Sequence, residues 1–137
     1  MTNFYISPSS FSYREYNKLI IDISQLGWYP PWVWPRQCFC YDALISKKVI
    51  QRMLKALTLT DVFIACVPGT ASTNIEIGAA YTLCEEVFLV AKDPVHFTQT
   101  GLSDAIVAML PGVKRVCCEI NEIPIMLQKE YPNLINC

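Results

Sequence analysis

The sequence predicts an α/β fold in which a parallel β-sheet carries helices on both faces. Residues 62–67 form a continuous apolar run of strand length, and residues 86–91 form another after an initial glutamate, which is typical of strands buried on both faces. Segments with helical periodicity lie before and after these runs. Strands that alternate with helices pair in parallel through right-handed crossovers, so we expect a three-layer flavodoxin-like or Rossmann-like fold.

The first predicted strand is residues 3–7, and a helix follows it after a short loop. Ser12 and Glu15 have the spacing of a capping box, which marks the start of this helix. Gly27 marks its end, because glycine is common just beyond a helix C-terminus. The predicted apolar face of the helix comprises Leu19, Ile20, Ile23 and Leu26.

Residues 28–34 have the weakest strand pattern in the chain. Pro30 and Pro31 have no amide hydrogen to donate to a neighbouring strand, so an edge strand or an irregular segment fits better than a central strand. The next segment, residues 44–57, has the periodicity of a helix. The apolar residues that show this periodicity are Val49, Ile50, Met53, Leu54 and Leu57.

The second half of the chain continues the alternation. Pro68 and Gly69 end the strand at residues 62–67, and a helix start is predicted at Thr73. The remaining predicted elements are a strand at 86–91, a short helix at 103–110, a strand at 113–118 and a helix at 122–131. Five strands in 137 residues favour a five-stranded parallel sheet of order 2-1-3-4-5, in a single domain over residues 1–137.

This strand order places a binding crevice. The first strand lies beside the third, and open α/β sheets bind ligands between the carboxyl ends of such strands. Residues 5–10 and 68–76 therefore converge on one crevice. The candidate ligand contacts in these two segments are Ser7, Ser9, Gly69, Thr70, Ser72 and Asn74.

Composition and charge exclude several classes of protein. The chain is 53% hydrophobic and 17% charged, which is not the composition of a disordered protein. Its formal net charge is −1 and it has no basic stripe, so we expect no binding to a nucleic-acid polymer. No apolar run approaches the ~20 residues that span a bilayer, and no secretory signal is evident. We therefore expect a cytoplasmic protein that does not enter a membrane.

The seven cysteines lack the spacing of a metal or redox motif. Cys38 and Cys40 form a CxC pair and Cys117 and Cys118 are adjacent, whereas zinc knuckles and thioredoxin-like sites use CxxC. Other cysteines fall in apolar runs, where a reduced thiol behaves as a small hydrophobic group. The odd count in an intracellular setting argues against a disulfide framework. We expect neither a metal nor a cofactor.

Glu76 admits two interpretations. Thr73 followed by Glu76 has the spacing of a capping box, a device that satisfies backbone amides at a helix start. A carboxylate at the switch point of an α/β sheet can also act as a nucleophile at the anomeric carbon of a sugar. Tyr5 is then either a hydrogen-bond donor to Glu76 or to the substrate, or a core aromatic with a wetted hydroxyl. Asp61 opens its strand at the amino end, away from this crevice.

The loop ahead of Glu76 also admits two interpretations. Thr70, Ser72, Thr73 and Asn74 bring hydroxyl and amide groups close to a helix N-terminus, where backbone amides favour an anion such as a phosphate. The same residues are equally consistent with a polar turn. The segment contains neither GxxxxGK[ST] nor GxGxxG, so it is neither a P-loop nor a dinucleotide-binding loop.

The tryptophans and the single histidine carry weaker signals. Trp28, Trp32 and Trp34 either stack on a nucleobase or, more commonly, pack under a loop or at a subunit interface. His96 lies in the loop after the strand at 86–91 and has no second histidine with which to form a metal pair. No Ser-His-Asp arrangement stands out.

Three segments carry a family resemblance: FYISPSSF near the start, DVFIACVPG in the middle and TNIEIGAAYTLCEEVFLVA after it. They resemble the nucleoside 2-deoxyribosyltransferase family, including its 2′-deoxynucleoside 5′-monophosphate N-hydrolase branch. The likeness covers the first strand and residues 61–91, and EIGAA is its most specific part.

The resemblance implies roles for particular residues. Glu76 would be the nucleophile that attacks C1′ and releases the base, and Tyr5 would orient it. Thr70 stands where the transferases have an aspartate that contacts the sugar 5′-hydroxyl, and a hydroxyl residue there resembles the branch that accepts 5′-monophosphates. Ser103 resembles a serine that a neighbouring subunit donates to the phosphate in that branch. Met53 stands where the family tends to have an aspartate that helps handle the base.

Three functional interpretations follow. The leading one is an enzyme that cleaves or exchanges the N-glycosidic bond of a (deoxy)nucleoside or its 5′-monophosphate, with a glutamate nucleophile. The second is a catalytically inactive nucleotide-binding or regulatory module, which Met53 favours. The third is a TIR-like NAD-cleaving domain, although residues 72–76 lack the tryptophan and cysteine expected around its glutamate. A homodimer or higher homo-oligomer is expected, because the family completes its site across an interface and the mean hydropathy is +0.29.

Overall fold

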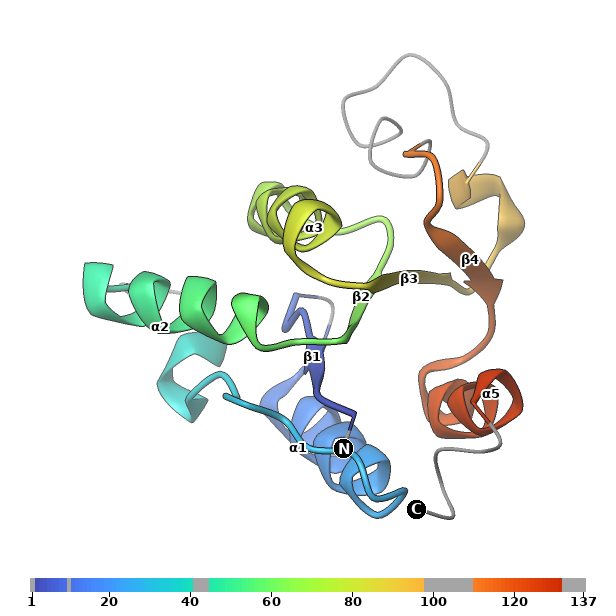
Figure 1. Ribbon diagram of the computed structural model, residues 1–137, viewed down its shortest axis with the longest axis horizontal. Coiled ribbons are helices and arrows are strands. Elements are labelled where there is room, and N and C mark those ends of the chain that lie inside the picture. The colour runs from blue at the N-terminus through green and yellow to red at the C-terminus, as the bar shows by residue number, and fades with distance from the viewer. Residues whose placement is uncertain (1, 10, 41–44, 98–109, 132–137) are drawn as a thin grey trace.

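The chain forms a three-layer α/β structure with a parallel sheet in the middle (Figure 1). The structure is a computed structural model that describes residues 2–9, 11–40, 45–97 and 110–131. The strands are β1 (Phe4–Ile6), β2 (Val62–Cys66), β3 (Glu86–Ala91) and β4 (Lys114–Cys117). They pair in the order β1-β2-β3-β4, and every pairing is parallel. The predicted parallel α/β architecture is confirmed.

The prediction of five strands in the order 2-1-3-4-5 is wrong, because the sheet of the described residues has four. Residues 28–34 contribute a single parallel bridge, between Tyr29 and Asn3, in place of a strand. Phe4 N–H donates to the Tyr29 carbonyl at 2.9 Å, and Tyr29 N–H donates to the Thr2 carbonyl at 2.9 Å. The two prolines that follow have no amide hydrogen, so the pairing cannot continue along a ladder.

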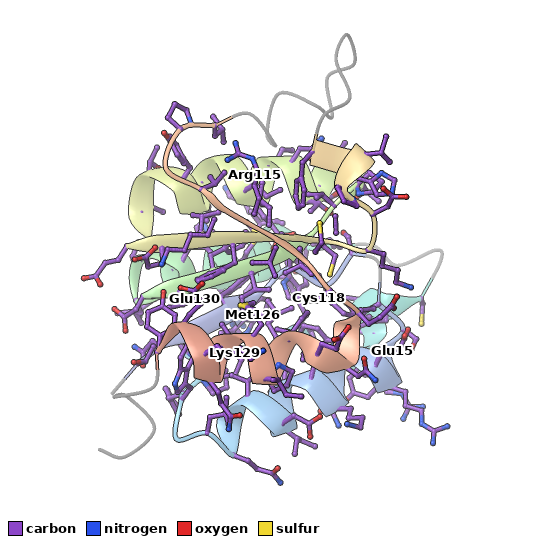
Figure 2. All side chains as sticks on the ribbon, turned by 90° about the vertical axis from the view of Figure 1, so that its right-hand side faces the viewer. Glu15, Arg115, Cys118, Met126, Lys129 and Glu130 are labelled. Carbon is purple, nitrogen blue, oxygen red and sulfur yellow. The ribbon has the colours of Figure 1, made fainter. Side chains whose placement is uncertain are left out.

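Helices cover both faces of the sheet. α2 and α3 lie on one face, and α1 and α5 lie on the other (Figure 1). Figure 2 shows the same layers from the side of β4, with the strands between α3 and α5. The helices are α1 (Tyr13–Ser24), α2 (Lys47–Thr58), α3 (Ala71–Leu83) and α5 (Ile123–Glu130), with short 3₁₀ helices η1 (Arg36–Phe39), η2 (Pro94–Phe97) and η3 (Ile120–Glu122). The helix predicted at residues 103–110 lies outside the described residues except for Leu110.

α1 begins where its capping box predicts. Ser12 Oγ accepts a hydrogen bond from Glu15 N–H at 3.2 Å, and Glu15 Oε1 accepts one from Ser12 N–H at 3.0 Å. Gly27 follows the helix with a φ of 89°, a conformation that glycine adopts without a steric penalty. Leu19, Ile20 and Ile23 of the predicted apolar face are buried.

α2 buries a narrower face than its periodicity predicts. Met53, Ala56 and Leu57 are buried, whereas Ile50 and Leu54 are 37% and 42% exposed. Positions 50 and 54 are one turn apart and form a second stripe beside the buried one. The described residues do not cover this second stripe, although α2 itself forms where the periodicity predicts a helix.

The two central strands form the middle of the core. Phe63 and Ile64 of β2 and Phe88 and Leu89 of β3 have no exposed surface, as continuous apolar runs predict. Burial of each such side chain stabilises the fold by ~1.5–3 kcal/mol. Among the helices of the described residues, none has the length and apolar character needed to cross a membrane.

Candidate active site

The carboxyl ends of β1 and β2 lie side by side, as the predicted switch point requires. Tyr5 pairs with Phe63 and Ile6 with Ile64, which brings the two following loops together. Ser7 extends this pairing by one residue, because its N–H donates to the Ile64 carbonyl at 2.9 Å. Segments about seventy residues apart in the chain therefore meet at one edge of the sheet.

Glu76 is the centre of this meeting point. Tyr5 Oη donates a hydrogen bond to Glu76 Oε2 at 2.6 Å, and Ser7 Oγ donates to Oε1 at 3.3 Å. All three side chains are buried, and Glu76 is only 3% exposed. Tyr5 also stacks on Phe63, with the ring centroids 5.6 Å apart. Three of the predicted site residues, from β1, the loop after it and α3, thus form one buried polar cluster.

Glu76 does not cap its helix, so the capping interpretation of this residue is wrong. α3 begins at Ala71 with Thr70 as its N-cap, three residues earlier than the predicted start. Thr70 N–H donates to Thr73 Oγ1 at 3.1 Å, and Thr73 N–H donates to Thr70 Oγ1 at 3.4 Å. The two threonines therefore make the reciprocal cap between themselves, and Glu76 falls in the second turn of the helix. Its carboxyl group is buried against β1 without a role in satisfying the helix terminus.

The loop before α3 holds the other predicted contacts. Ser9 and Thr70 join the two loops, because their hydroxyl oxygens lie 3.2 Å apart. Gly69 packs so closely that a Cβ there would lie 2.5 Å from Thr73 Cβ, which explains a glycine at this position. Ser72 is exposed and Asn74 is partly buried, and both lie in the first turn of α3. Ser103 lies outside the described residues.

Burial sets the protonation of this cluster. It raises the pKa of Glu76 from an ordinary 4.5 to about 7, and hydrogen bonds from Tyr5 and Ser7 oppose the rise. Burial, together with the negative charge of Glu76, raises the pKa of Tyr5 well above its ordinary value. Tyr5 therefore remains a protonated donor, while Glu76 changes its charge near neutral pH.

Trp34 belongs to the cluster, although the sequence interpretation considered the tryptophans only for stacking or packing. Its indole Nε1–H donates to Tyr5 Oη at 2.6 Å, and its backbone N–H donates to Tyr16 Oη at 3.0 Å. The side chain is 4% exposed. A buried indole N–H usually donates to an acceptor, so a buried tryptophan near the site is a candidate hydrogen-bond donor. Because the segment around Trp34 is irregular, the sequence does not indicate which group accepts this hydrogen bond.

The remaining tryptophans and Met53 are packing residues in the described structure. Trp28 is buried 6.4 Å from the Phe4 ring, and the Trp32 ring lies 5.0 Å from that of Trp34. Met53 is 4% exposed and belongs to the buried face of α2. The position at which the resembling family tends to have an acid is therefore apolar and enclosed.

A thiol-lined pocket of about 210 Å³ lies at the same edge of the sheet. Cys66 from the end of β2, Lys92 and His96 from beyond β3, and Cys118 from beyond β4 are among its lining residues. Burial raises the pKa of Cys66 to about 12, so this thiol stays protonated at neutral pH. All the described cysteines are free thiols, and no group of three metal-ligating side chains in the described ranges is arranged to hold a metal ion.

Comparison with known proteins bears on the fold. No protein-family model matches the chain, and no curated protein matches its sequence. Among solved structures, the chain is similar to the CMP N-glycosidase BcmB of Clostridium botulinum, with a TM-score of 0.59 and 19% sequence identity. The likeness covers 93% of this chain and 99% of that chain. The two proteins share a fold. At this identity the likeness carries no residue roles from one chain to the other.

Proposed function

We propose that the protein cleaves or exchanges the N-glycosidic bond of a (deoxy)nucleoside or its 5′-monophosphate, with Glu76 as the nucleophile. The observation that carries the proposal is the buried Glu76 carboxyl group held by Tyr5 and Ser7 at the carboxyl edge of the sheet. The fold shared with a CMP N-glycosidase supports the same reaction class. Fold alone does not determine function, so the proposal rests mainly on the buried cluster of Tyr5, Ser7 and Glu76.

The proposed reaction has two steps. The Glu76 carboxylate attacks C1′ of the sugar while the C1′–N bond breaks, and the base leaves with the bonding electron pair and takes up a proton. A glycosyl ester on Glu76 results. In the second step water, or a second base, attacks C1′ and restores the carboxylate, and the incoming nucleophile loses a proton. The carboxylate stabilises the oxocarbenium-like transition state directly, so the reaction class needs no metal.

The hydroxyl groups at the start of α3 are proposed to receive the 5′ end of the substrate. Ser9 and Thr70 lie together where the two loops meet, and Ser72 is exposed in the first turn. The backbone amides at a helix N-terminus and the helix dipole favour an anion at such a position. We therefore propose a 5′-monophosphate as the preferred substrate, with Asn74 and Gly69 at the same loop.

Thr70→Asp is expected to change the preference between nucleotide and nucleoside. Aspartate is also a good N-cap, so the start of α3 should be retained. Its negative charge would repel a phosphate, and we expect kcat/KM for the 5′-monophosphate to fall roughly 100-fold, with a much smaller change for the nucleoside. Base release from both substrates measures the ratio. Thr70→Ser is the matched control, and an unchanged ratio in Thr70→Asp would place the phosphate elsewhere.

The proposal is tested by a chromatographic assay of the purified protein. Deoxynucleosides, ribonucleosides, their 5′-monophosphates and NAD are each incubated with and without an acceptor base. Release of free base supports N-glycosidase activity, and appearance of a new nucleoside supports transfer. Cleavage of NAD and of no other compound, to nicotinamide and an ADP-ribose product, would support the TIR-like alternative instead.

A nucleotide-binding module without catalysis is the second candidate. The leaving base needs a proton, and the position at which the resembling family tends to have an acid is the enclosed Met53. Ligand binding by calorimetry with no base release for any compound would favour this candidate. The homo-oligomer expected from the resemblance stays a prediction, and the exposed Ile50 and Leu54 of α2 are compatible with it.

A further inference from the structure

We propose that Trp34 is a positioning residue, which acts through Tyr5 to keep the Glu76 carboxyl group as a hydrogen-bond acceptor. The inference rests on the function proposed above, because it concerns the readiness of the nucleophile. It assigns a directed chain of hydrogen bonds that begins at the indole of Trp34 and ends at the carboxylate.

The direction of the chain follows from the chemistry of the indole. A tryptophan Nε1–H can only donate, so Tyr5 Oη has to accept at the 2.6 Å contact with Trp34. The Tyr5 hydroxyl then has its own proton to give, and Glu76 Oε2 lies 2.6 Å away. Tyr5 is 1% exposed, so no bulk water competes for that proton. The arrangement makes Glu76 Oε2 an acceptor, and an ionised carboxylate accepts such a hydrogen bond more strongly than a protonated carboxyl group does.

The reverse arrangement leaves a proton without an acceptor. If a protonated Glu76 donated to Tyr5 Oη, the tyrosine oxygen would accept from both Glu76 and Trp34. Within the described residues, Tyr5 Oη has these two hydrogen-bond partners, so its own proton would then have no acceptor there. An unsatisfied buried polar group costs ~1–3 kcal/mol. Trp34 therefore opposes protonation of Glu76 at Oε2, whereas burial of the carboxyl group favours protonation.

A second contact holds the indole in place. The backbone N–H of Trp34 donates to Tyr16 Oη at 3.0 Å, so this residue spans the tyrosines of β1 and α1. The ring also packs against Trp32. Since Oε2 is engaged at 2.6 Å and Oε1 has only the 3.3 Å contact with Ser7, Oε1 is the oxygen left freer to attack C1′.

Trp28 provides a matched control. Its side chain is 3% exposed, against 4% for Trp34. It packs against Phe4, which lies next to Tyr5 in β1. Its Nε1 has no hydrogen-bond partner in the described part of the chain. Trp28→Phe therefore removes a buried indole of the same size without removing a donor to the Tyr5–Glu76 pair. A general effect of lost packing should appear in both variants.

The test measures the ionisation of Glu76 directly. Carbon-13 NMR of the glutamate carboxyl groups, with Glu76→Gln to assign the signal, gives the pKa of Glu76 without any substrate. We expect Trp34→Phe to raise this pKa by roughly one unit and Trp28→Phe to leave it unchanged. In the Tyr5→Phe background, Trp34→Phe should add little. An equal rise in that background, or no rise in Trp34→Phe alone, overturns the proposal.

The kinetic readout separates this inference from the proposed function. With the substrate found in the base-release assay, Trp34→Phe should lower kcat about tenfold and move the acidic limb of the pH profile upward by the same unit, with KM changed by less than about threefold. An unaltered pH profile overturns the role of Trp34 while the proposed function stands. Absence of turnover in the wild type overturns the proposed function, and the NMR titration then still decides whether Trp34 acts on Glu76.

Discussion

Glu76→Gln is expected to lower the rate of base release by at least on the order of 10³-fold while the fold is retained. Glutamine has nearly the same shape, and its side-chain oxygen can still accept the hydrogen bond from Tyr5 Oη. An amide does not form the glycosyl ester that the proposed reaction requires. The loss should therefore appear in kcat, with little change in the binding of the nucleotide.

The measurement compares base release by the variant and the wild type under single-turnover conditions, with circular dichroism as the check on the fold. Glu15→Gln is the control. Glu15 lies in the capping box of α1, and glutamine also fits that position, so this variant should keep both its fold and its activity. Substantial base release by Glu76→Gln would show that Glu76 is not the nucleophile.

The fold was predictable where the pattern of apolar residues in the sequence matches the burial that the packing requires. Residues 62–67 and 87–91 are apolar throughout, and β2 and β3 are the two strands of the described sheet with a neighbour on each side. Pro30 and Pro31 marked residues 28–34 as the weakest strand, and the structure reduces that segment to one bridge. The predicted number of five strands was wrong because residues 28–34, although rich in residues that favour strands, contain two prolines. These prolines have no amide hydrogens with which to bond to a neighbouring strand.

The meeting of Tyr5, Ser7 and Glu76 followed from topology alone, since parallel strands that neighbour each other end at the same edge. The helix start was mispredicted because Thr70 and Thr73 both fit an N-cap, and the spacing from Thr73 to Glu76 matched the commoner pattern. Trp34 was missed because it lies in an irregular segment, which has no period from which to infer where a side chain points.

The stability of the protein should depend on pH through Glu76, and Glu76→Gln should remove that dependence. The pKa of Glu76 is about 7 in the folded protein and near 4.5 when unfolded. Below the lower value both states are protonated and the group has no effect. Between the two values only the unfolded state ionises, so the free energy of unfolding falls as pH rises. At about 1.4 kcal/mol per pKa unit, the full loss is about 3 kcal/mol above pH 7.

Urea denaturation at pH 5 and pH 8 measures this effect. We expect the difference in the free energy of unfolding between Glu76→Gln and the wild type to shift in favour of the variant by about 2.5 kcal/mol from pH 5 to pH 8, because part of the full effect is already present at pH 5. The same difference in the free energy of unfolding at both pH values would show that Glu76 ionises at its ordinary pKa.

The expected result bears on function, because carboxyl groups with strongly shifted pKa values cluster at functional sites. A carboxylate that costs this much to bury, and that is buried between a donor from β1 and a donor from the following loop, is better explained by the attack on C1′ than by packing.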